Sequence, residues 1–268
     1  MKCILMNKNT QVAGLELDEE LLYNMIYKRK SFHLFRNIGK ETISLEKLEE
    51  IEKTYQLCTP LCPEIKTAIQ IVPSNKTNCK RGQEYCILFY SEKKDNYLQN
   101  IGYLGEQLEL NLVSQNIGTL WFGIGKVKEE SYEGLEFVIM MGISQIDDEK
   151  KFRKDMFQSK RKALEEIWVG EPIEGVAEIA RFAPSACNTQ PWFVENADGI
   201  IKVFRYKEPG KRGIMPVAKI SYYNQIDIGI FLCVLELCLK HKQIAYEREM
   251  FIDCGGEEEK SLVAIYKY

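Results

Sequence analysis

The sequence predicts an α+β fold in which antiparallel-rich central sheets are flanked by helices and the same unit occurs twice in tandem. Three observations carry this prediction. Short strand-like apolar runs lie between polar loops, and two long segments are apolar on most sides, as buried helices are. The order of these elements in residues 16–146 repeats in residues 160–268. We therefore expect residues 1–268 to form a single unit built from two halves.

The first half opens with a predicted helix over residues 15–26, which runs into a basic segment. A second helix is predicted to begin near Ser44, because serine is a good N-cap and Glu46 in the first turn suits the helix dipole. Two predicted strands follow at residues 68–72 and 85–90. A polar stretch links them.

The first half closes on a long helix predicted for residues 96–116, which should be central because it is apolar on most sides. Gly118 is expected to end this helix in a left-handed turn. Strands are predicted at residues 119–122 and 137–141.

The second half repeats this order after a charged connector at residues 147–162. Its first helix is predicted to begin at Pro172, since proline suits the first helical position, and to end at Pro184. The remaining predicted elements are strands at 192–194 and 200–206, a long apolar helix at 224–240, and strands at 244–248 and 261–266.

The repetition is visible letter by letter. Residues 100–112 align with residues 227–239 at an offset of 127, with identities Ile, Gly, Leu, Glu, Leu and Leu. The earlier helices align at an offset of 128, where Glu46, Glu50 and Ile51 match Glu174, Glu178 and Ile179. Units of more than a hundred residues favour a fused pair of domains over a short-period solenoid.

Composition excludes several classes. The net charge of −3, with basic residues spread along the chain, argues against nucleic acid as the main partner. No apolar run reaches the roughly 20 residues that span a bilayer, and the apolar run at residues 1–7 is too short for a secretory signal. Nine cysteines without a Cys-x-x-Cys pair indicate free thiols, no metal site and a cytoplasmic location.

Residues 183–192 read Ala-Pro-Ser-Ala-Cys-Asn-Thr-Gln-Pro-Trp and contain the most specific signal in the chain. Asn188 and Gln190 can each donate and accept hydrogen bonds, as the edge of a flat heteroaromatic ring with alternating carbonyl and N–H groups requires. The alternative is an ordinary helix-to-strand loop in which Asn188 caps the local backbone.

This segment resembles the flavin-contacting loop of the FMN-dependent nitroreductase family, and the tandem arrangement resembles a subgroup with two halves in one polypeptide. The resemblance implies a nitroreductase-like fold in which the halves mimic the family homodimer. It also implies that the following residues bind the cofactor FMN: Pro184, Ser185, Ala186, Asn188 and Gln190.

A second segment, residues 29–35, resembles the family's Arg-x-Ser-x-Arg-x-Phe motif, which contacts the ribityl chain, the phosphate and the pyrimidine side of the flavin. The resemblance implies cofactor binding by Arg29, Lys30, Ser31 and His33. His33 stands where the family usually has Arg or Lys, which weakens the expected stabilisation of the anionic reduced flavin. Without the resemblance, this segment would be a solvated basic helix end.

Two further segments carry the resemblance. Residues 116–123 are similar to the family's Gly-Leu-Gly-Thr-x-Trp segment, which implies that Thr119, Leu120 and Trp121 approach the flavin ring. The alternative is a helix cap followed by a buried strand. Residues 159–164 resemble a basic stretch in which an arginine meets the phosphate, here Arg161; the alternative is a solvated charge run.

The basic arm, residues 29–35, has its motif only in the first half. The amide-rich loop, residues 183–192, has its motif only in the second half. We therefore expect one composite site per chain, in a monomer that imitates a dimer. Residues 73–81 and 209–223 are expected to line the mouth of the pocket. No side chain is expected to act as a catalytic acid or base.

The resemblance implies an oxidoreductase that moves two electrons from NAD(P)H through FMN to a small oxidised acceptor, such as a nitroaromatic or a quinone. Two alternatives stay open at this point. One is a flavin- or small-ligand-binding protein without turnover. The other is a flavin enzyme of the same fold with another reaction, such as reductive dehalogenation.

Overall fold

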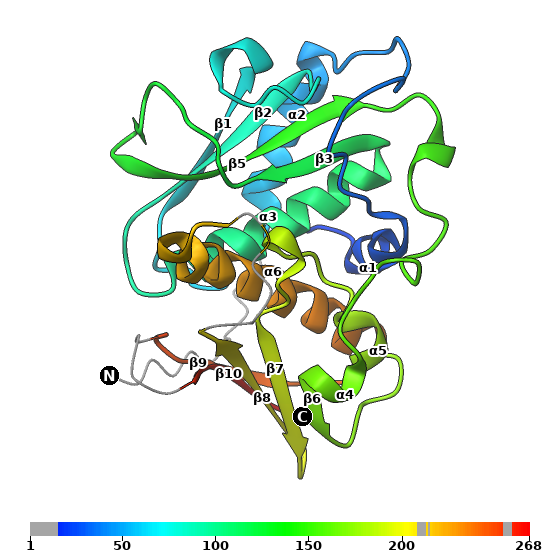
Figure 1. Ribbon diagram of the computed structural model, residues 1–268, viewed down its shortest axis with the longest axis vertical. Coiled ribbons are helices and arrows are strands. Elements are labelled where there is room, and N and C mark those ends of the chain that lie inside the picture. Colours follow the sequence, from blue (N-terminus) through cyan, green and yellow to red (C-terminus); the bar gives the residue numbers. More distant parts are fainter. Residues whose placement is uncertain (1–15, 208–212, 214, 254–258) are drawn as a thin grey trace.

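Two β-sheets lie at opposite ends of the molecule, and long helices cross between them (Figure 1). The computed structural model describes residues 16–207, 213, 215–253 and 259–268. The helices are α1 (Glu19–Lys28), α2 (Leu45–Leu57), α3 (Tyr97–Ser114), α4 (Leu164–Ile167), α5 (Ala177–Ala180) and α6 (Ile220–His241). The strands are β1 (Thr67–Pro73), β2 (Tyr85–Ser91), β3 (Ile117–Phe122), β4 (Ser131–Tyr132), β5 (Leu135–Gln145), β6 (Trp168–Gly170), β7 (Trp192–Ala197), β8 (Ile200–Tyr206), β9 (Glu247–Met250) and β10 (Lys260–Lys267).

The first sheet has the order β1-β2-β5-β3, with the short β4 paired to β5, and its described strand pairs are antiparallel. The second sheet has the order β6-β7-β8-β10-β9, in which β6 and β7 run parallel and the other described pairs run antiparallel. The predicted α+β class with antiparallel-rich sheets is therefore confirmed. The division into two tandem halves, at about 16–146 and 160–268, remains a prediction.

The helices α3 and α6 cross at the centre, between the two sheets (Figure 1). Each carries a glycine where the other helix approaches most closely. A Cβ atom on Gly102 would lie 2.0 Å from the carbonyl oxygen of Ile226, and one on Gly229 would lie 1.9 Å from that of Gln99. Any larger residue at either position would force the two backbones apart.

One apolar cluster runs through α1, α2, α3, α5, α6 and strands of both sheets, so the two sheets share a core. A smaller cluster covers the other face of the first sheet, around Phe32, Phe35 and Phe152. By length and composition, residues 217–241 could cross a membrane, but 83% of their apolar window is buried inside the molecule. This segment, which contains α6, is therefore a core helix.

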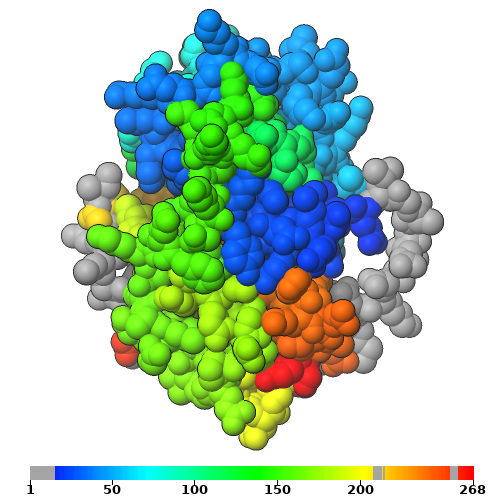
Figure 2. Space-filling model, turned by 90° about the vertical axis from the view of Figure 1, so that its right-hand side faces the viewer, coloured from blue at the N-terminus to red at the C-terminus, as the bar shows by residue number. Residues whose placement is uncertain are grey.

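The helix α1 joins the two ends of the molecule along one face, where its dark blue surface lies above the orange end of α6 (Figure 2). Its N-cap is Asp18, whose carboxylate accepts a hydrogen bond from the Leu21 amide. The ring of Tyr23 stacks on His241 with the centroids 3.7 Å apart, and Glu20 contacts the same histidine at 2.8 Å. These contacts fix the direction in which the chain leaves α1 toward Arg29.

The structure corrects two predicted helix ends. Gly118 does not end the central helix, because Asn116 takes the left-handed conformation with φ 57° and Gly118 lies within β3, paired with Ser144. Asparagine tolerates that conformation better than most residues. At the start of the chain, α1 begins at Glu19, four residues later than predicted, because Asp18 caps it; Leu15 lies outside the described residues.

Two elements of the second half also differ from their predictions. The helix predicted between Pro172 and Pro184 is reduced to the single turn α5, because Gly175 adopts φ 73°, through which an α-helix cannot continue. The strand predicted at residues 244–248 is displaced to β9. Its partner β10 ends at Lys267, which pairs with Glu247, so residues before 247 have no strand to bond.

Candidate functional site

A cavity of about 280 Å³ lies between the β3 edge of the first sheet and the start of α6. Residues from both predicted halves line it. The part that precedes residue 147 contributes Arg29, Ser31, His33, Arg81, Leu120, Trp121, Phe122, Gly123, Ile124 and Ile139. The later part contributes Pro184, Ser185, Ala186, Cys187, Met215, Pro216, Tyr223, Ile226, Asp227 and Ile230. The wall is largely apolar, with charged groups at a few points.

The arm after α1 runs beside β3 like an extra strand. Ser31 forms a parallel bridge with Thr119, and the Phe32 amide donates to the Thr119 carbonyl at 2.9 Å. Because side chains alternate along an extended segment, Arg29, Ser31 and His33 face the cavity. Lys30 points elsewhere and donates to the Lys151 carbonyl at 2.8 Å.

Arg29 is held in place by a buried carboxylate on α3. Its Nε lies 3.0 Å from Glu109 Oε2, and its Nη2 donates to Ser31 Oγ at 3.0 Å. Glu109 also accepts hydrogen bonds from Thr119 Oγ1 at 2.5 Å and from Trp121 Nε1 at 2.8 Å. One carboxylate therefore orients the arm and the β3 segment together.

The charges around Glu109 depend on one another. Burial alone would raise the pKa of Glu109, but Arg29 and the hydrogen bonds from its neighbours lower it on balance. Burial would likewise lower the pKa of Arg29, but Glu109 and Glu106 raise it. Glu106, one turn earlier, has a pKa well above its usual range because of burial and the adjacent Glu109 charge. The cluster thus holds one ionised pair and one neutral acid.

The segment 183–192 is a strained loop, and its residues 184–187 line the cavity. Three non-glycine residues adopt the left-handed conformation: Cys187 at φ 51°, Asn188 at φ 57° and Gln190 at φ 50°. Such residues are uncommon and persist where surrounding contacts impose them. Here the Gln190 amide donates to Ser185 Oγ at 2.9 Å and the Ala186 amide donates to Asp227 Oδ1 at 2.9 Å.

The side chains of Asn188 and Gln190 turn away from the cavity wall and fix residues 160–162. Asn188 Oδ1 accepts from Arg161 Nη1 at 2.9 Å, and Asn188 Nδ2 donates to the Lys160 carbonyl at 3.1 Å. Gln190 Oε1 accepts from the Lys162 amide at 2.8 Å. Pro184, Ser185 and Ala186 are the predicted loop residues that line the cavity itself.

Arg161 belongs to a cluster of cations beside this loop. Its Nη2 donates to the Phe182 carbonyl at 3.0 Å, and its buried Nε has no hydrogen-bond partner among the described residues. Burial lowers the pKa of Arg161 to about 10, with further lowering by Arg29, Arg153 and Arg181. No carboxylate pairs with Arg161 in the described part of the chain, so an anion bound here would relieve the repulsion.

The β3 segment forms the apolar floor. Leu120 and Trp121 line the cavity, whereas Thr119 is fully buried and donates a hydrogen bond to Glu109. The hydroxyl group of Tyr223 donates to the Gly123 carbonyl, which joins α6 to the end of this segment. A Cβ atom on Gly123 would lie 2.8 Å from the Tyr223 ring, so a larger residue would displace this wall.

Sequence reasoning missed several wall residues. Of residues 73–81, Arg81 lines the cavity; of residues 209–223, the described members Met215, Pro216 and Tyr223 do so, while 209–212 and 214 lie outside the described residues. Asp227 also lines the cavity, although no motif in the sequence singled it out. Glu109 could have been found from the helix alignment, because an acid conserved between two apolar helices must have a buried partner.

In the described part of the chain, no group of three or more His, Cys, Asp or Glu side chains is arranged to hold a metal ion. The seven described cysteines form no disulfide. Six of them are buried, and Cys187 is exposed beside the cavity.

Comparison with known proteins places the chain in a family. A family model described as "Putative TM nitroreductase" matches residues 21–239. The chain belongs to this nitroreductase family. A crystal structure of a "putative nitroreductase" from Thermotoga maritima MSB8 shares the nitroreductase fold, with a TM-score of 0.59 at 17% identity, covering 98% of this chain and 99% of that chain. The search of curated proteins gave no significant match.

Shorter nitroreductase structures align over part of the chain. A nitroreductase family protein from Clostridium difficile 630 has a TM-score of 0.42 at 14% identity, over 59% of this chain and 99% of that chain. A "putative nitroreductase" from Desulfovibrio desulfuricans, crystallised in complex with FMN, has a TM-score of 0.38 at 15% identity, over 57% and 97% of the two chains.

Proposed function

We propose that this nitroreductase-family protein is an oxidoreductase that binds FMN non-covalently and moves two electrons from NAD(P)H to a small oxidised acceptor, such as a nitroaromatic or a quinone. The single observation that carries the proposal is that three segments far apart in the sequence line one cavity. These are the arm at residues 29–33, the strand segment at 120–123 and the loop at 184–187.

The residues present fit FMN in chemistry, and Arg161, which does not line the cavity itself, lies beside the loop whose residues 184–187 do. A ring system needs apolar faces, which Leu120, Trp121 and Ile226 offer. A phosphate needs cations that are not already neutralised. Arg161 meets that need, because it bonds to an amide oxygen and two carbonyls, and keeps a buried Nε with no described partner.

Bound FMN would supply the two-electron chemistry, and this chain would bind, orient and shield it. Arg29, fixed by Glu109, would hold the polar end of the ligand on one side. Arg161 would meet the phosphate from the other, fixed by Asn188. The apolar wall would exclude water from the reacting face, which strengthens each of these polar contacts.

The tandem organisation is part of the proposal. The close contacts between α3 and α6 pair Gly102 with Ile226 and Gly229 with Gln99. Adding 127 to the residue number in α3 gives the residue in α6 that makes the corresponding contact, so one offset converts each contact into the other. A two-fold axis between related helices produces this kind of exchange. We infer a cytoplasmic monomer with two related halves and one composite site, without nucleic acid or membrane partners.

The test is direct. The purified protein is expected to be yellow or to take up added FMN, to bind one FMN per chain in native mass spectrometry, and to be bleached by NADH or NADPH without oxygen. A colourless protein that does not bind added FMN would overturn the proposal. Two FMN per chain would overturn the single composite site while leaving the family chemistry in place.

Turnover separates an enzyme from a flavin carrier. His33, an exposed histidine at a position that is usually more basic, is the feature that favours binding without turnover. Steady-state oxidation of NAD(P)H with a nitroaromatic or quinone supports the oxidoreductase. Reduction of bound FMN by NAD(P)H with no reoxidation by either acceptor would favour the carrier or a different reaction, such as reductive dehalogenation.

A further inference from the structure

Asp227 is a buried acid on the wall of the cavity. It lies in α6, and its side chain is almost entirely enclosed, with 3% of the residue surface exposed. Its Oδ1 accepts a hydrogen bond from the Ala186 amide at 2.9 Å, and its Oδ2 lies 3.4 Å from Thr189 Oγ1. Among the described residues, no Lys, Arg or His forms an ion pair with it.

The matching position in α3 shows what this site needs for structure alone. Asn100 precedes Asp227 by 127 residues, is also buried, and its Oδ1 accepts from the Cys62 amide at 3.0 Å. A neutral amide therefore suffices to receive a backbone N–H at this point of the helix. Asn100 does not belong to the cavity wall. Of these two aligned positions, the one that lines the cavity carries a carboxyl group, Asp227, and the other carries an amide, Asn100.

The groups that face Asp227 across the cavity do not neutralise it. The titratable side chains on the wall are Arg29, His33 and Arg81 from the first half, with Cys187 and Tyr223 from the second. Burial raises the pKa of Asp227 to about 8, against the lowering effect of the hydrogen bonds from Ala186 and Thr189. At neutral pH the carboxyl group keeps its proton.

On the basis of the function proposed above, we propose that Asp227 supplies the proton that the acceptor needs when it takes up electrons in this cavity. A quinone that receives a hydride needs one proton to become a hydroquinone. The carboxyl O–H bond breaks and an O–H bond forms on the acceptor oxygen. NAD(P)H provides the two electrons, by way of the bound flavin, and the carboxylate then recovers a proton from water.

The decisive variant is Asp227→Asn, which keeps the size of the side chain and the acceptor for the Ala186 amide. The rate of acceptor reduction by the wild-type holoenzyme is expected to fall as the pH rises through about 8. The variant is expected to be slower by on the order of 100-fold at neutral pH and to lack that decline, because general acids contribute roughly 10²–10⁴. Its FMN affinity is expected to be unchanged. A variant with the wild-type rate and the wild-type decline would overturn the inference.

Infrared difference spectra of the FMN-free protein provide a readout that does not require activity. Glu106 gives a protonated carboxyl band in both proteins, so the spectrum of Asp227→Asn is subtracted from that of the wild type. The difference is expected to show a second protonated carboxyl band at neutral pH, which belongs to Asp227 and disappears well above pH 8. Absence of this band from the wild-type protein would overturn the inference even in an active flavoenzyme. If the protein binds no FMN, the proposed function fails, and the spectra still decide whether Asp227 is a neutral acid.

The matched control is Asn100→Asp, which places a carboxyl group at the equivalent position away from the cavity wall. It is expected to lower the stability, because a buried acid replaces an amide, and to leave the pH dependence of the rate as in the wild type. If the rate of Asn100→Asp acquires an additional decline near the same pH, a carboxyl group away from the cavity wall has the same effect. That result would contradict a direct role for Asp227.

Discussion

Glu109 in α3 and Glu236 in α6 lie 127 residues apart, at positions that the alignment of the two helices matches. Both carboxylates are buried, and both have a lowered pKa because an arginine and several hydroxyl or N–H groups outweigh the effect of burial. What differs is the part of the molecule that each one holds. Two glutamates at aligned positions of the two helices therefore hold different parts of the molecule.

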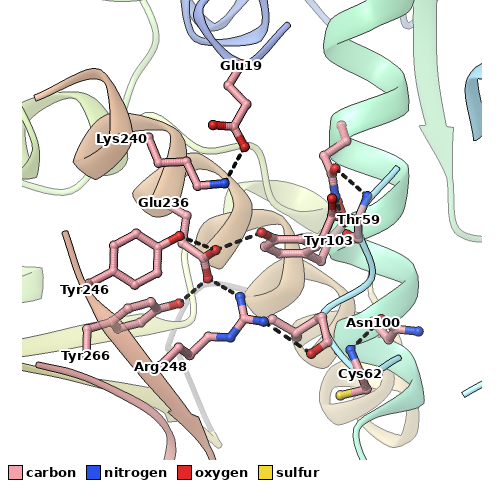
Figure 3. A network of polar contacts seen from close by, with 12 residues as sticks. Glu19, Thr59, Cys62, Asn100, Tyr103, Glu236, Lys240, Tyr246, Arg248 and Tyr266 are labelled. Carbon is pink, nitrogen blue, oxygen red and sulfur yellow. Dashed lines mark hydrogen bonds and ion pairs between the residues drawn. The ribbon is translucent and has the colours of Figure 1, made fainter. Parts of the chain in front are cut away.

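Glu236 binds strands to helices. Its Oε2 accepts from the hydroxyl groups of Tyr103 at 2.8 Å and Tyr246 at 2.7 Å, and its Oε1 accepts from Tyr266 at 2.8 Å and from Arg248 (Figure 3). These partners come from α3, β9, β10 and the segment before β9, and none of them lines the cavity. The second half therefore uses its glutamate as a structural anchor.

Glu109 holds the walls of the candidate site. Of its partners, Arg29 and Trp121 line the cavity, and Thr119 carries the backbone bridge to the arm. The neighbouring acid also differs between the helices, since Glu106 corresponds to Cys233 at the same offset. A second carboxyl group thus lies one turn before the glutamate in α3, beside the candidate site, and not in α6.

The largest expected effect is the loss of stability in Glu236→Gln. Glu236 is buried, and removing its carboxylate leaves the partly buried Arg248 without its anion, which costs about 3–5 kcal/mol of the free energy of unfolding. Denaturant titration of the variant measures this loss. Because the pKa of Glu236 is lowered in the folded protein, the difference from wild type is present above about pH 4.3 and shrinks as the pH falls. FMN affinity of the folded variant should not change, and a large change would contradict its purely structural role.

Glu109→Gln should lower the free energy of unfolding less than Glu236→Gln does, and it should lower the FMN affinity more. Glu106 also interacts with Arg29, and its ionisation is no longer opposed once Glu109 is neutral, so we expect a loss of about 2–3 kcal/mol. FMN affinity should fall, because Arg29 loses the group that orients it. Fluorescence titration with FMN measures the affinities of the Glu109→Gln and Glu236→Gln variants side by side. Equal FMN affinities in the two variants would remove the functional distinction between the glutamates.

Arg161→Gln tests the cluster of cations that contains Arg161 and also Arg29, Arg153 and Arg181. A charge-assisted hydrogen bond contributes about 1.5–3 kcal/mol, so FMN affinity should fall by roughly 10- to 150-fold. Riboflavin, which has no phosphate, should bind as it does to wild type. The exposed Arg36→Gln removes the same charge elsewhere and should leave both affinities unchanged. An equal loss of FMN and riboflavin binding would place Arg161 away from the phosphate.

The smallest and most symmetrical effect concerns the two glycines at the helix crossing. Gly102→Ala and Gly229→Ala each bring a methyl group against the backbone of the opposite helix and should cost about 1–3 kcal/mol of unfolding free energy. Thermal unfolding of both variants is the measurement. Because the two contacts are related by one offset, the losses should be similar. A loss in one variant alone would break the proposed two-fold relation.

Local sequence signals predicted most elements of the fold, because caps and apolar runs act over a few residues. Ser44 caps α2 as expected, with its hydroxyl accepting from the Lys47 amide at 3.2 Å. The prediction failed between Pro172 and Pro184, where a single backbone angle at Gly175 decides whether the helix continues. No residue pattern distinguishes a tolerated helical glycine from one that adopts φ 73°.

The candidate site was predicted as a set of segments but not as a set of side chains. The arm and the loop meet at one cavity, as their motifs indicated. Four predicted residues do not line it: Lys30, Arg161, Asn188 and Gln190. Their direction depends on a bridge and on hydrogen bonds to residues more than twenty positions away. Arg81 was missed as an individual residue because loop conformation places it there.

The contacts around Glu236 set the order in which this chain can acquire its structure. Tyr103 of α3 donates to a carboxylate that follows it by 133 residues, and that carboxylate also accepts from Tyr266 of β10. During synthesis on the ribosome the first sheet can form early, but the contacts around Glu236 cannot be completed until β10 has emerged. Nascent chains must therefore wait with α3 partly uncovered, and a truncation that removes β10 should leave a polypeptide that depends on chaperones.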